Sequence, residues 1–199
     1  MNKPLVLASR SQARARLLRY AGVDVKISPA DIDEAALKRS MVLQGMALPE
    51  TATALAEEKA RECNRKNPDC LILAADQILV FKGKIFDKPK SVIEAKAQLQ
   101  ALRGHSHSLV SAAVIYENSI RVWSCASQVK LSMRPFTDAF LNSYIETVGD
   151  DLFTTVGGYK LESIGSQLFS GIKGDYFSVL GLPLLEVLEF LRGQGICQT

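Results

Sequence analysis

Two serines and an arginine follow the first apolar run of the chain, in the stretch LVLASRSQARARLL at residues 5–18. Ser9 and Ser11 come just before a helix-like segment, and Arg14 lies in its first turn. A helix N-terminus offers unpaired backbone N–H groups and a partial positive charge, which suit a phosphate group. An arginine there can bind the same anion through two N–H groups. The alternative is that the serines only cap the helix and that Arg14 is solvated.

An acid closes a second apolar run, LILAAD at residues 71–76. We expect Asp76 to lie where a buried strand reaches the carboxyl edge of a sheet, which is where open α/β sheets bind ligands. A carboxylate that loses hydration there requires a cation, a metal ion or a role as a base. The alternative is an aspartate that caps the turn after the strand.

Three further charged residues extend this set. Glu34 lies in the stretch DIDEAAL, which on its own is typical of a solvated acidic loop or the first turn of a helix. Lys59 and Lys88 are uninformative in isolation, because most lysines are solvated. Together with Asp76 and Arg14, however, these residues supply two carboxylates for a divalent cation and three cations for phosphates. Hydrolysis of a triphosphate requires this combination, because the charge on the phosphates must be neutralised while a water is aligned.

Strands and helices that alternate along the chain must position these residues. Helices alternate with both strands and hairpins, so we expect an α/β fold with a mixed sheet. We expect strands at residues 4–9, 71–76, 107–116, 120–133 and 166–172, a hairpin at 77–89, and helices at 12–20 and 50–67 and from residues 91, 137 and 183.

Caps and turns mark the boundaries of these elements. Ser11 and Thr137 are expected N-caps, and Ser91 with Glu94 three residues later forms a capping box. The expected hairpin turns lie at Lys82-Gly83 and at Glu117-Asn118.

Composition and charge exclude several classes of protein. With 47% hydrophobic residues, the 199-residue chain can fill the core of one substantial domain or of two small domains that share a cleft. A net charge of +3 is too small for a duplex-DNA binder but allows a small anionic substrate. No apolar run approaches the roughly 18 residues that span a bilayer, and no signal-type segment is present, so we expect a cytoplasmic location. We therefore expect neither nucleic acid nor a membrane as a partner.

Other patterns have structural explanations. Four cysteines are scattered without a CxxC pair, which disfavours a structural zinc site and a disulfide framework. His105 and His107 resemble a metal pair, but no third ligand lies nearby, and a junction between loop and strand explains them. The chain lacks GxxxxGK[ST], so a Walker-type ATPase is disfavoured. Core packing explains the leucines of the last helix, Leu184, Leu185, Leu188 and Leu191.

Several separated motifs together resemble those of the Maf family of nucleoside triphosphate pyrophosphatases. They are, in order, LASRSQARARLL, DIDE, LAEEKA, LAADQILV, DKP, LRGHSHSLVSAAVI and GLPLLEVLEFLRGQG. The resemblance covers nearly the whole chain and implies a single domain over residues 1–199. It implies an elongated, mixed, twisted sheet flanked by helices with a deep cleft, as in inosine triphosphate pyrophosphatases. Members cleave noncanonical or pyrimidine nucleotides between the α- and β-phosphates with a divalent metal, here Mg²⁺ or Mn²⁺, giving a monophosphate and pyrophosphate.

The resemblance also assigns roles to the phosphate-binding stretch. Ser9, Ser11 and Arg14 match the family's phosphate-binding Ser-x-Ser-x-Arg-Arg motif. It therefore implies that the triphosphate binds at the start of the first helix.

The same resemblance implies catalytic and metal-binding roles for the other charged residues. Asp76 matches the acid assigned as general base, and Glu34 matches a carboxylate that, with Asp76, is associated with the metal. Lys59 and Lys88 match lysines that line the triphosphate site.

Three positions bear on which base is preferred. Ala13 stands where the family usually has Arg or Trp, which removes a stacking partner of roughly 1–3 kcal/mol per base. Gln77 follows Asp76, and Glu162 lies in YKLES. At both positions the chain resembles the branch of the family that hydrolyses 7-methyl-GTP. A carboxylate at Glu162 can accept hydrogen bonds from guanine N1–H and N2–H and favours a positively charged 7-methylated ring. The alternative for Glu162 is a solvated loop residue.

Other functions stay open at this point. A pyrophosphatase of the same family that prefers dTTP or UTP would use the same residues, and a non-catalytic nucleotide-binding regulator of cell division is a second alternative. The retained set of charged residues favours an enzyme, because a decayed site should lose costly clustered charges first. We expect a nucleoside triphosphate as partner, and a homodimer stays open.

Overall fold

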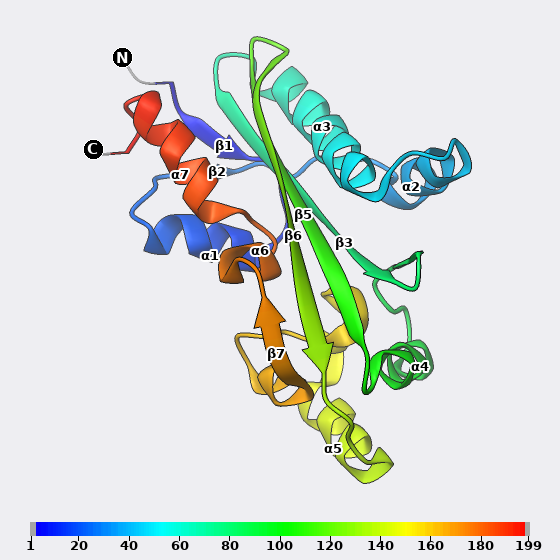
Figure 1. Ribbon diagram of the computed structural model, residues 1–199. Helices are drawn as coiled ribbons and strands as arrows, with labels where there is room; N and C mark the ends of the chain where they lie inside the picture. The colour runs from blue at the N-terminus through cyan, green and yellow to red at the C-terminus, as the bar shows by residue number, and fades with distance from the viewer. Residues whose placement is uncertain (1–2, 198–199) are drawn as a thin grey trace. The chain divides into compact units, whose positions relative to one another are not determined.

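The computed structural model describes residues 3–197 as a mixed α/β fold. Its sheet has the strand order β2-β1-β3-β5-β6-β7, with β4 paired to β3 (Figure 1). β1 pairs in parallel with β2 and β3, whereas the pairs β3–β4 and β6–β7 are antiparallel. The predicted mixed sheet is therefore confirmed. The strands are β1 (Leu5–Leu7), β2 (Lys26–Ile27), β3 (Leu71–Phe81), β4 (Lys84–Phe86), β5 (Ser106–Glu117), β6 (Ile120–Met133) and β7 (Phe169–Lys173).

Seven α-helices and three short 3₁₀ helices are described. The α-helices are α1 (Gln12–Tyr20), α2 (Glu34–Leu43), α3 (Leu48–Lys66), α4 (Val92–Leu102), α5 (Asp138–Val148), α6 (Tyr176–Val179) and α7 (Leu184–Gly193). The 3₁₀ helices are η1 (Gly149–Phe153), η2 (Val156–Gly158) and η3 (Ile164–Leu168). Within residues 3–197, every helix is too short or too polar to cross a membrane.

The chain divides into two compact units, each with its own set of packed residues. Unit 1 comprises the described residues of Met1–Gln77, Ser111–Ser127 and Gly181–Thr199, and unit 2 comprises Ile78–Val110 and Gln128–Leu180.

In unit 1, helix α3 packs against β1, β3 and β5. Its small residues Ala56 and Ala60 meet Val6 and Ile72 of the sheet, and Val114 completes the contact from β5. Small side chains on the helix let it approach the strands closely, and this places the polar residues at the ends of the strands next to α3. The packing of α3 on the sheet thus determines which residues of α3 lie within reach of the Asp76 side chain.

In unit 2, α4, α5 and the 3₁₀ segments enclose an apolar core. It includes Leu99 of α4, Tyr144 of α5 and Leu131 of β6, all of them buried. The first bond of the predicted capping box is confirmed, since Ser91 Oγ accepts from the Glu94 backbone N–H at 3.2 Å. The Glu94 carboxylate returns to the Lys90 N–H at 2.9 Å.

Most predicted boundaries match the structure. Ser11 and Thr137 cap α1 and α5, accepting from backbone N–H groups three residues on. The first hairpin turns at Lys82 and Gly83, both with positive φ. The second turn was predicted one residue too early, because β5 continues through Glu117.

The predicted end of the strand that begins at Leu71, β3, is wrong. β3 does not stop at Asp76 but runs on to Phe81. The strand continues because its end pairs with β4, while β1 pairs only with Leu71–Leu73. Asp76 therefore lies within a strand, just beyond the point where the parallel neighbour ends. It cannot be a turn cap, but it does lie at the carboxyl edge of the parallel part of the sheet.

The leucine stripe of α7 is only partly a core stripe. Leu184 and Leu191 are buried as expected, but Leu185 is 56% exposed. The prediction fails at Leu185 because it follows Leu184 directly, and consecutive helical residues point about 100° apart around the axis.

Candidate functional site

A lysine joins two carboxylates in unit 1. The Lys59 Nζ atom of α3 lies 2.5 Å from Asp76 Oδ1 and 3.0 Å from Glu34 Oε2. The side chains of Lys59 and Asp76 are 9% and 8% exposed, whereas that of Glu34 is 53% exposed. Because burying a charge without a partner is costly, Asp76 and Lys59 stabilise each other as an ion pair. The structure thus brings together three residues that the sequence places far apart.

A helix start positions Glu34. Asp33 is the N-cap of α2, and its Oδ1 accepts from the Ala36 backbone N–H at 2.9 Å. Glu34 is therefore the first residue of the helix. Of the two local explanations for the acidic stretch, the structure shows the helix start, with the Glu34 carboxylate directed to Lys59.

Arg14 is buried rather than solvated. Its Nε donates to the Gly181 carbonyl at 2.7 Å, and its Nη1 donates to the Ala75 carbonyl at 2.8 Å and to Ser9 Oγ at 3.2 Å. Burial lowers the pKa of the Arg14 guanidinium, and the negative charges of Asp76 and Glu34 raise it again. An arginine stays protonated under such opposing effects at neutral pH. Arg14 therefore brings a fixed positive charge to the edge of the sheet.

The two serines shape the loop between β1 and α1. Ser9 Oγ accepts from the Ser11 backbone N–H at 3.2 Å as well as from Arg14. Ser11 Oγ accepts from the Arg14 backbone N–H at 3.3 Å. These bonds use the hydroxyl oxygens as acceptors, so each O–H group can still donate to an anion. The capping role and the phosphate-binding role of the serines are thus compatible.

Asp76 and Gln77 point to opposite faces of the sheet. Neighbouring side chains of a strand alternate, so Asp76 faces α3 while Gln77 faces away from it. On that second face, Gln77 Nε2 donates to the buried Ser111 Oγ at 2.9 Å. Asp76 and Gln77 therefore have different partners on opposite faces of the sheet, and Arg14 binds the carbonyl of Ala75, the residue before Asp76.

The other predicted residues are distributed over both units. Ala13 is half-buried on α1 of unit 1. Lys88 lies in the exposed connection between β4 and α4, and Glu162 is exposed before η3, both in unit 2.

The carboxylates of the site fit a divalent cation that shares its ligands with a polyphosphate. Glu34 and Asp76 reach the same ammonium group. Mg²⁺ is typically bound by one or two carboxylates, with substrate phosphates and water completing the shell. Among the described residues, no three His, Cys, Asp or Glu side chains are grouped to hold a metal by themselves. The donor set therefore suits Mg²⁺ or Mn²⁺ on a phosphate rather than a closed metal cage.

One supporting residue was missed by sequence reasoning. Gly181 lies just before α7 with φ +97°, and a Cβ there would lie 3.2 Å from Arg14 Nε. Its carbonyl also accepts from Arg14. The only signal for this role was a glycine placed before Leu-Pro at the start of a helix.

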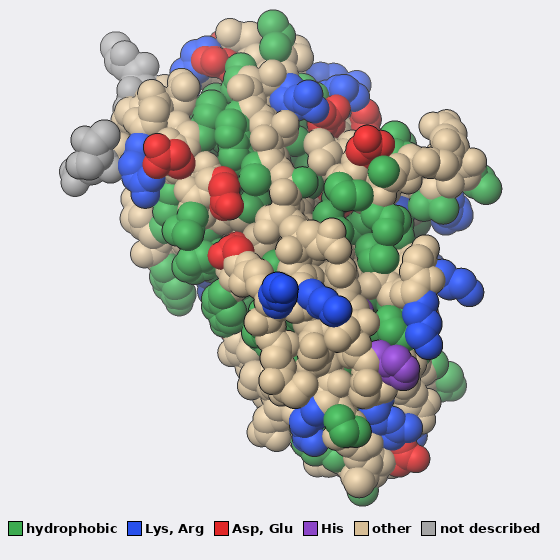
Figure 2. Space-filling model, viewed as in Figure 1, with side chains coloured by type: hydrophobic (Ala, Val, Ile, Leu, Met, Phe, Trp, Pro, Cys, Tyr) green, Lys and Arg blue, Asp and Glu red, His purple; other side chains and the backbone are tan. Residues whose placement is uncertain are grey.

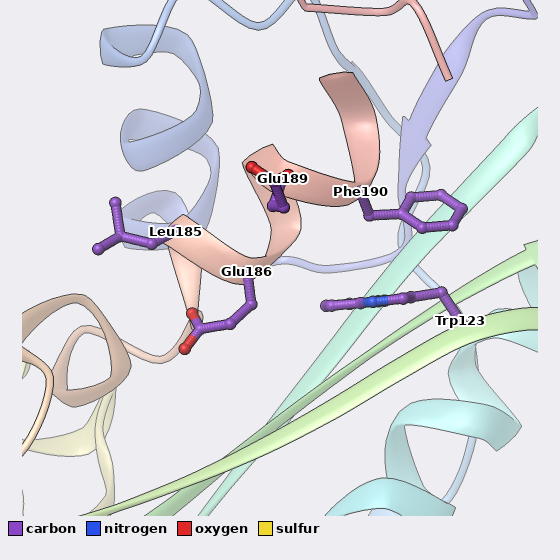
Figure 3. Close-up of a pocket in the computed structure, with 5 residues that line it drawn as sticks. All are labelled: Trp123, Leu185, Glu186, Glu189 and Phe190. Carbon is purple, nitrogen blue, oxygen red and sulfur yellow. The ribbon is translucent and has the colours of Figure 1, made fainter. Parts of the chain in front are cut away.

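A hollow on the α7 surface of unit 1 contains none of the predicted site residues. Figure 3 shows the Trp123 and Phe190 rings together at one end, Leu185 at the other end and Glu186 between them. The ring centroids of Trp123 and Phe190 are 5.6 Å apart. Glu186 and Glu189 add negative charge, and acidic side chains are visible over α7 in Figure 2. A polyphosphate would be repelled there, so the site around Asp76 is the better candidate.

Known proteins are similar to this chain over nearly its whole length. The model of the family described as Maf-like protein matches residues 4–194. The chain is 46% identical over 192 residues to "Nucleoside triphosphate pyrophosphatase 1" of Jannaschia sp. (strain CCS1), covering 96% of this chain and 97% of that one. It is 44% identical over 198 residues to "Nucleoside triphosphate pyrophosphatase" of Ruegeria sp. (strain TM1040), covering all of both.

A solved structure shares the fold. The HAM1 protein from Coxiella burnetii matches with a TM-score of 0.52 and 16% identity, covering 96% of this chain and 99% of that chain. At this identity, the likeness concerns the fold alone.

Proposed function

Because the chain belongs to the Maf family, we propose that it hydrolyses a nucleoside triphosphate between the α- and β-phosphates, releasing a nucleoside monophosphate and pyrophosphate. The observation that carries the proposal is the buried Asp76 carboxylate, which lies 2.5 Å from Lys59 and contributes to the electrostatic field at the Arg14 guanidinium. A fold that needed only packing would fill this edge with apolar residues. Buried charges that converge in one place are instead typical of catalytic sites.

Phosphate binding falls to the loop between β1 and α1. The hydroxyls of Ser9 and Ser11, the N-terminus of α1 and the Arg14 guanidinium all attract a polyanion. Three hydrogen bonds fix the Arg14 side chain, so its positive charge is in place before the substrate arrives. Such preorganised charge lowers the barrier because it needs no rearrangement during the reaction.

Asp76 acts as the general base in this proposal. Lys59 holds its Oδ1, and we assign to its Oδ2 the role of accepting a proton from the attacking water. Lys59 keeps the carboxylate oriented and offsets negative charge on the phosphates. Glu34 and Asp76 would hold the Mg²⁺ or Mn²⁺ ion, and the bound ion would supply charge neutralisation at the phosphate oxygens. Lys88 remains a proposed phosphate ligand on the family resemblance.

The base preference is the finer part of the proposal. Gln77 and Glu162 favour a 7-methyl-GTP-type nucleotide, since a carboxylate suits both the guanine N–H groups and the positive charge of the methylated ring. Ala13 matches neither the Arg nor the Trp that the family usually has at this position, so it does not distinguish this nucleotide from the alternative of dTTP or UTP. The cytoplasmic location, the single domain and the homodimer stay predictions from the sequence.

The test is pyrophosphate release from a panel of 7-methyl-GTP, UTP, dTTP and ITP, with Mg²⁺ or Mn²⁺ and with a chelator as control. We expect metal-dependent release that is fastest with 7-methyl-GTP. Fastest release from a pyrimidine nucleotide would keep the enzyme and overturn the base assignment. Nucleotide binding without release from any member of the panel would favour the non-catalytic regulator.

A further inference from the structure

A short segment of unit 2 is held by hydrogen bonds from several directions. We call residues 155–162, which carry the glycine pair and Glu162, the Tyr159 segment. The Thr155 hydroxyl donates to the Tyr159 carbonyl at 2.8 Å, within the segment. The buried Tyr144 hydroxyl of α5 donates to the Gly158 carbonyl at 3.0 Å. The backbone of the segment is therefore fixed both internally and from a neighbouring helix.

The shortest of these hydrogen bonds joins Tyr159 to His107. The His107 Nε2 atom on β5 lies 2.6 Å from the Tyr159 hydroxyl. Both residues are buried, and the Phe169 ring packs edge-on against Tyr159 with centroids 4.8 Å apart. Burial lowers the pKa of His107 to about 4 and raises the pKa of Tyr159, so both are neutral near pH 7. The bond is thus a neutral hydrogen bond in an apolar, aromatic setting.

His107 depends on this one bond for its polar contacts. Its other ring nitrogen, Nδ1, is buried and has no hydrogen-bond partner among the described residues. An imidazole in such surroundings would be replaced by an apolar side chain if packing were its only role, because an unpaired buried polar atom is costly. What His107 supplies is a partner for the hydroxyl of Tyr159.

Close backbone packing fixes both ends of the Tyr159 segment. Gly157 has φ +80°, and a Cβ there would lie 2.7 Å from both Leu79 and the Tyr159 ring. At the other end, a Cβ on Gly165 would lie 2.3 Å from the Lys160 carbonyl. Lys160 also pairs with Asp151, with Nζ and Oδ1 2.7 Å apart. Glu162 follows only two residues later.

We propose that Tyr159 and His107 are positioning residues. They fix the backbone of the segment that carries Glu162 and thereby set the base preference of the enzyme. This inference rests on the proposed function, in which Glu162 reads the base. The Glu162 carboxylate can discriminate between bases only if the backbone that carries it is held in place. The buried Tyr159–His107 hydrogen bond holds that backbone in place, and neither residue is proposed to contact the nucleotide.

The test removes one oxygen atom. Tyr159→Phe keeps the ring and its contact with Phe169 but deletes the bond to His107. We expect the ratio of kcat/KM values for the two best substrates of the panel to fall by about fivefold to tenfold, which corresponds to one hydrogen bond. Tyr176→Phe is the matched control, because it deletes a hydroxyl from a tyrosine that is 45% exposed in the same unit. Its ratio should equal that of the wild type.

Two further variants separate positioning from packing. His107→Phe should lower the substrate ratio as Tyr159→Phe does, whereas His107→Gln should restore part of it, because an amide can still bond to the Tyr159 hydroxyl. A variant that lowers kcat/KM equally for both substrates would show that the pair is merely structural and would overturn the proposal.

Glu162→Gln distinguishes failure of this inference from failure of the proposed function. If Glu162→Gln leaves the substrate profile unchanged, Glu162 does not read the base, and the base assignment fails. If it changes the profile but Tyr159→Phe does not, only the positioning proposal fails. In the double variant that combines Glu162→Gln with Tyr159→Phe, the proposal requires that Tyr159→Phe adds nothing to the change in substrate ratio caused by Glu162→Gln alone. Independent, additive effects on the ratio would contradict it.

Amide hydrogen exchange tests the mechanical step without any substrate. We expect peptides that cover residues 159–163 to exchange faster in Tyr159→Phe than in the wild type and in Tyr176→Phe. Unchanged exchange there would show that the bond does not hold the segment.

Discussion

Unit 1 buries charged side chains, whereas unit 2 buries polar groups that stay neutral. Among the described residues, the buried charged side chains are Arg14, Lys59 and Asp76, all in unit 1. In unit 2, burial lowers the pKa of His107 and raises those of Tyr144 and Tyr159.

Buried charges and buried neutral groups place different demands on a fold. A buried charge must be balanced by an opposite charge, and the balance is lost when either partner is removed. A buried neutral pair needs only geometry, and it contributes about as much as an ordinary hydrogen bond. The charges in unit 1 are therefore suited to chemistry on a polyphosphate, and the neutral pair in unit 2 is suited to holding a backbone in place.

The largest expected effect follows from removing the proposed base. Asp76→Asn keeps the shape of the side chain but cannot accept the proton of water, so turnover should fall by at least about 10²-fold. Nucleotide affinity measured without added metal should stay within a few-fold, because Arg14 and the serines are unchanged. The measurement is pyrophosphate release beside equilibrium nucleotide binding. Asp69→Asn, at an exposed aspartate of unit 1, is the control. Turnover at the wild-type rate in Asp76→Asn would remove Asp76 from the mechanism.

The second effect concerns the stability of the ion pair. Lys59→Met leaves the Asp76 carboxylate buried without its ammonium partner, so the free energy of unfolding should fall by about 3–5 kcal/mol. Denaturant unfolding at neutral pH measures this change. Lys66→Met on the same helix is the control, since Lys66 pairs with Glu62 at the exposed end of α3, where such pairs contribute little. Adding Asp76→Asn to Lys59→Met should cost less than the two single changes together. Full additivity would show that the pair is not coupled.

The third effect is a pH dependence of stability that originates in unit 2. The pKa of His107 is about 4 in the fold and about 6.5 in an unfolded chain, so the unfolded state binds the extra proton between these values. The stabilisation is complete above pH of about 6.5 and is lost as the pH falls toward 4, by about 3 kcal/mol in all. His107→Gln should flatten the curve of unfolding free energy against pH over this window.

The control for this pH effect is His105→Gln, because the exposed His105 ring lies beside the Arg103 carbonyl rather than in the core. Its curve should keep the slope of the wild type. Identical slopes in all three proteins would show that His107 does not titrate with unfolding.

Local features of the fold were predictable, because they depend on residues close in sequence. The N-caps at Ser11, Ser91 and Thr137 each use a side chain and a backbone N–H three residues apart, so a short stretch determines them. The same is true of the turn at Lys82-Gly83.

Features that depend on distant neighbours were not predictable. The extent of β3 beyond Asp76 follows from which strands flank it, and no local signal reports that. The support of Arg14 by Gly181 joins residues 167 positions apart. The opposite faces of Asp76 and Gln77 follow from strand alternation, but only once the strand is known to continue. Residue types indicated which groups could do chemistry, whereas their partners became known only from the fold.

The smallest expected effect on stability, and the sharpest test of the metal proposal, comes from Glu34. Its side chain is half exposed, and Lys59 keeps Asp76 as a partner when Glu34 changes. Glu34→Gln should therefore leave the unfolding midpoint nearly unchanged. If Glu34 helps to hold Mg²⁺, the Mg²⁺ concentration for half-maximal pyrophosphate release should rise by about tenfold or more, the loss typical when a group that supports a metal is removed. A purely structural Glu34 would give the reverse result, with a shifted midpoint and an unchanged Mg²⁺ dependence. Lys59, Glu34 and Asp76 would then form a structural ion-pair cluster. The metal would have to be bound without Glu34.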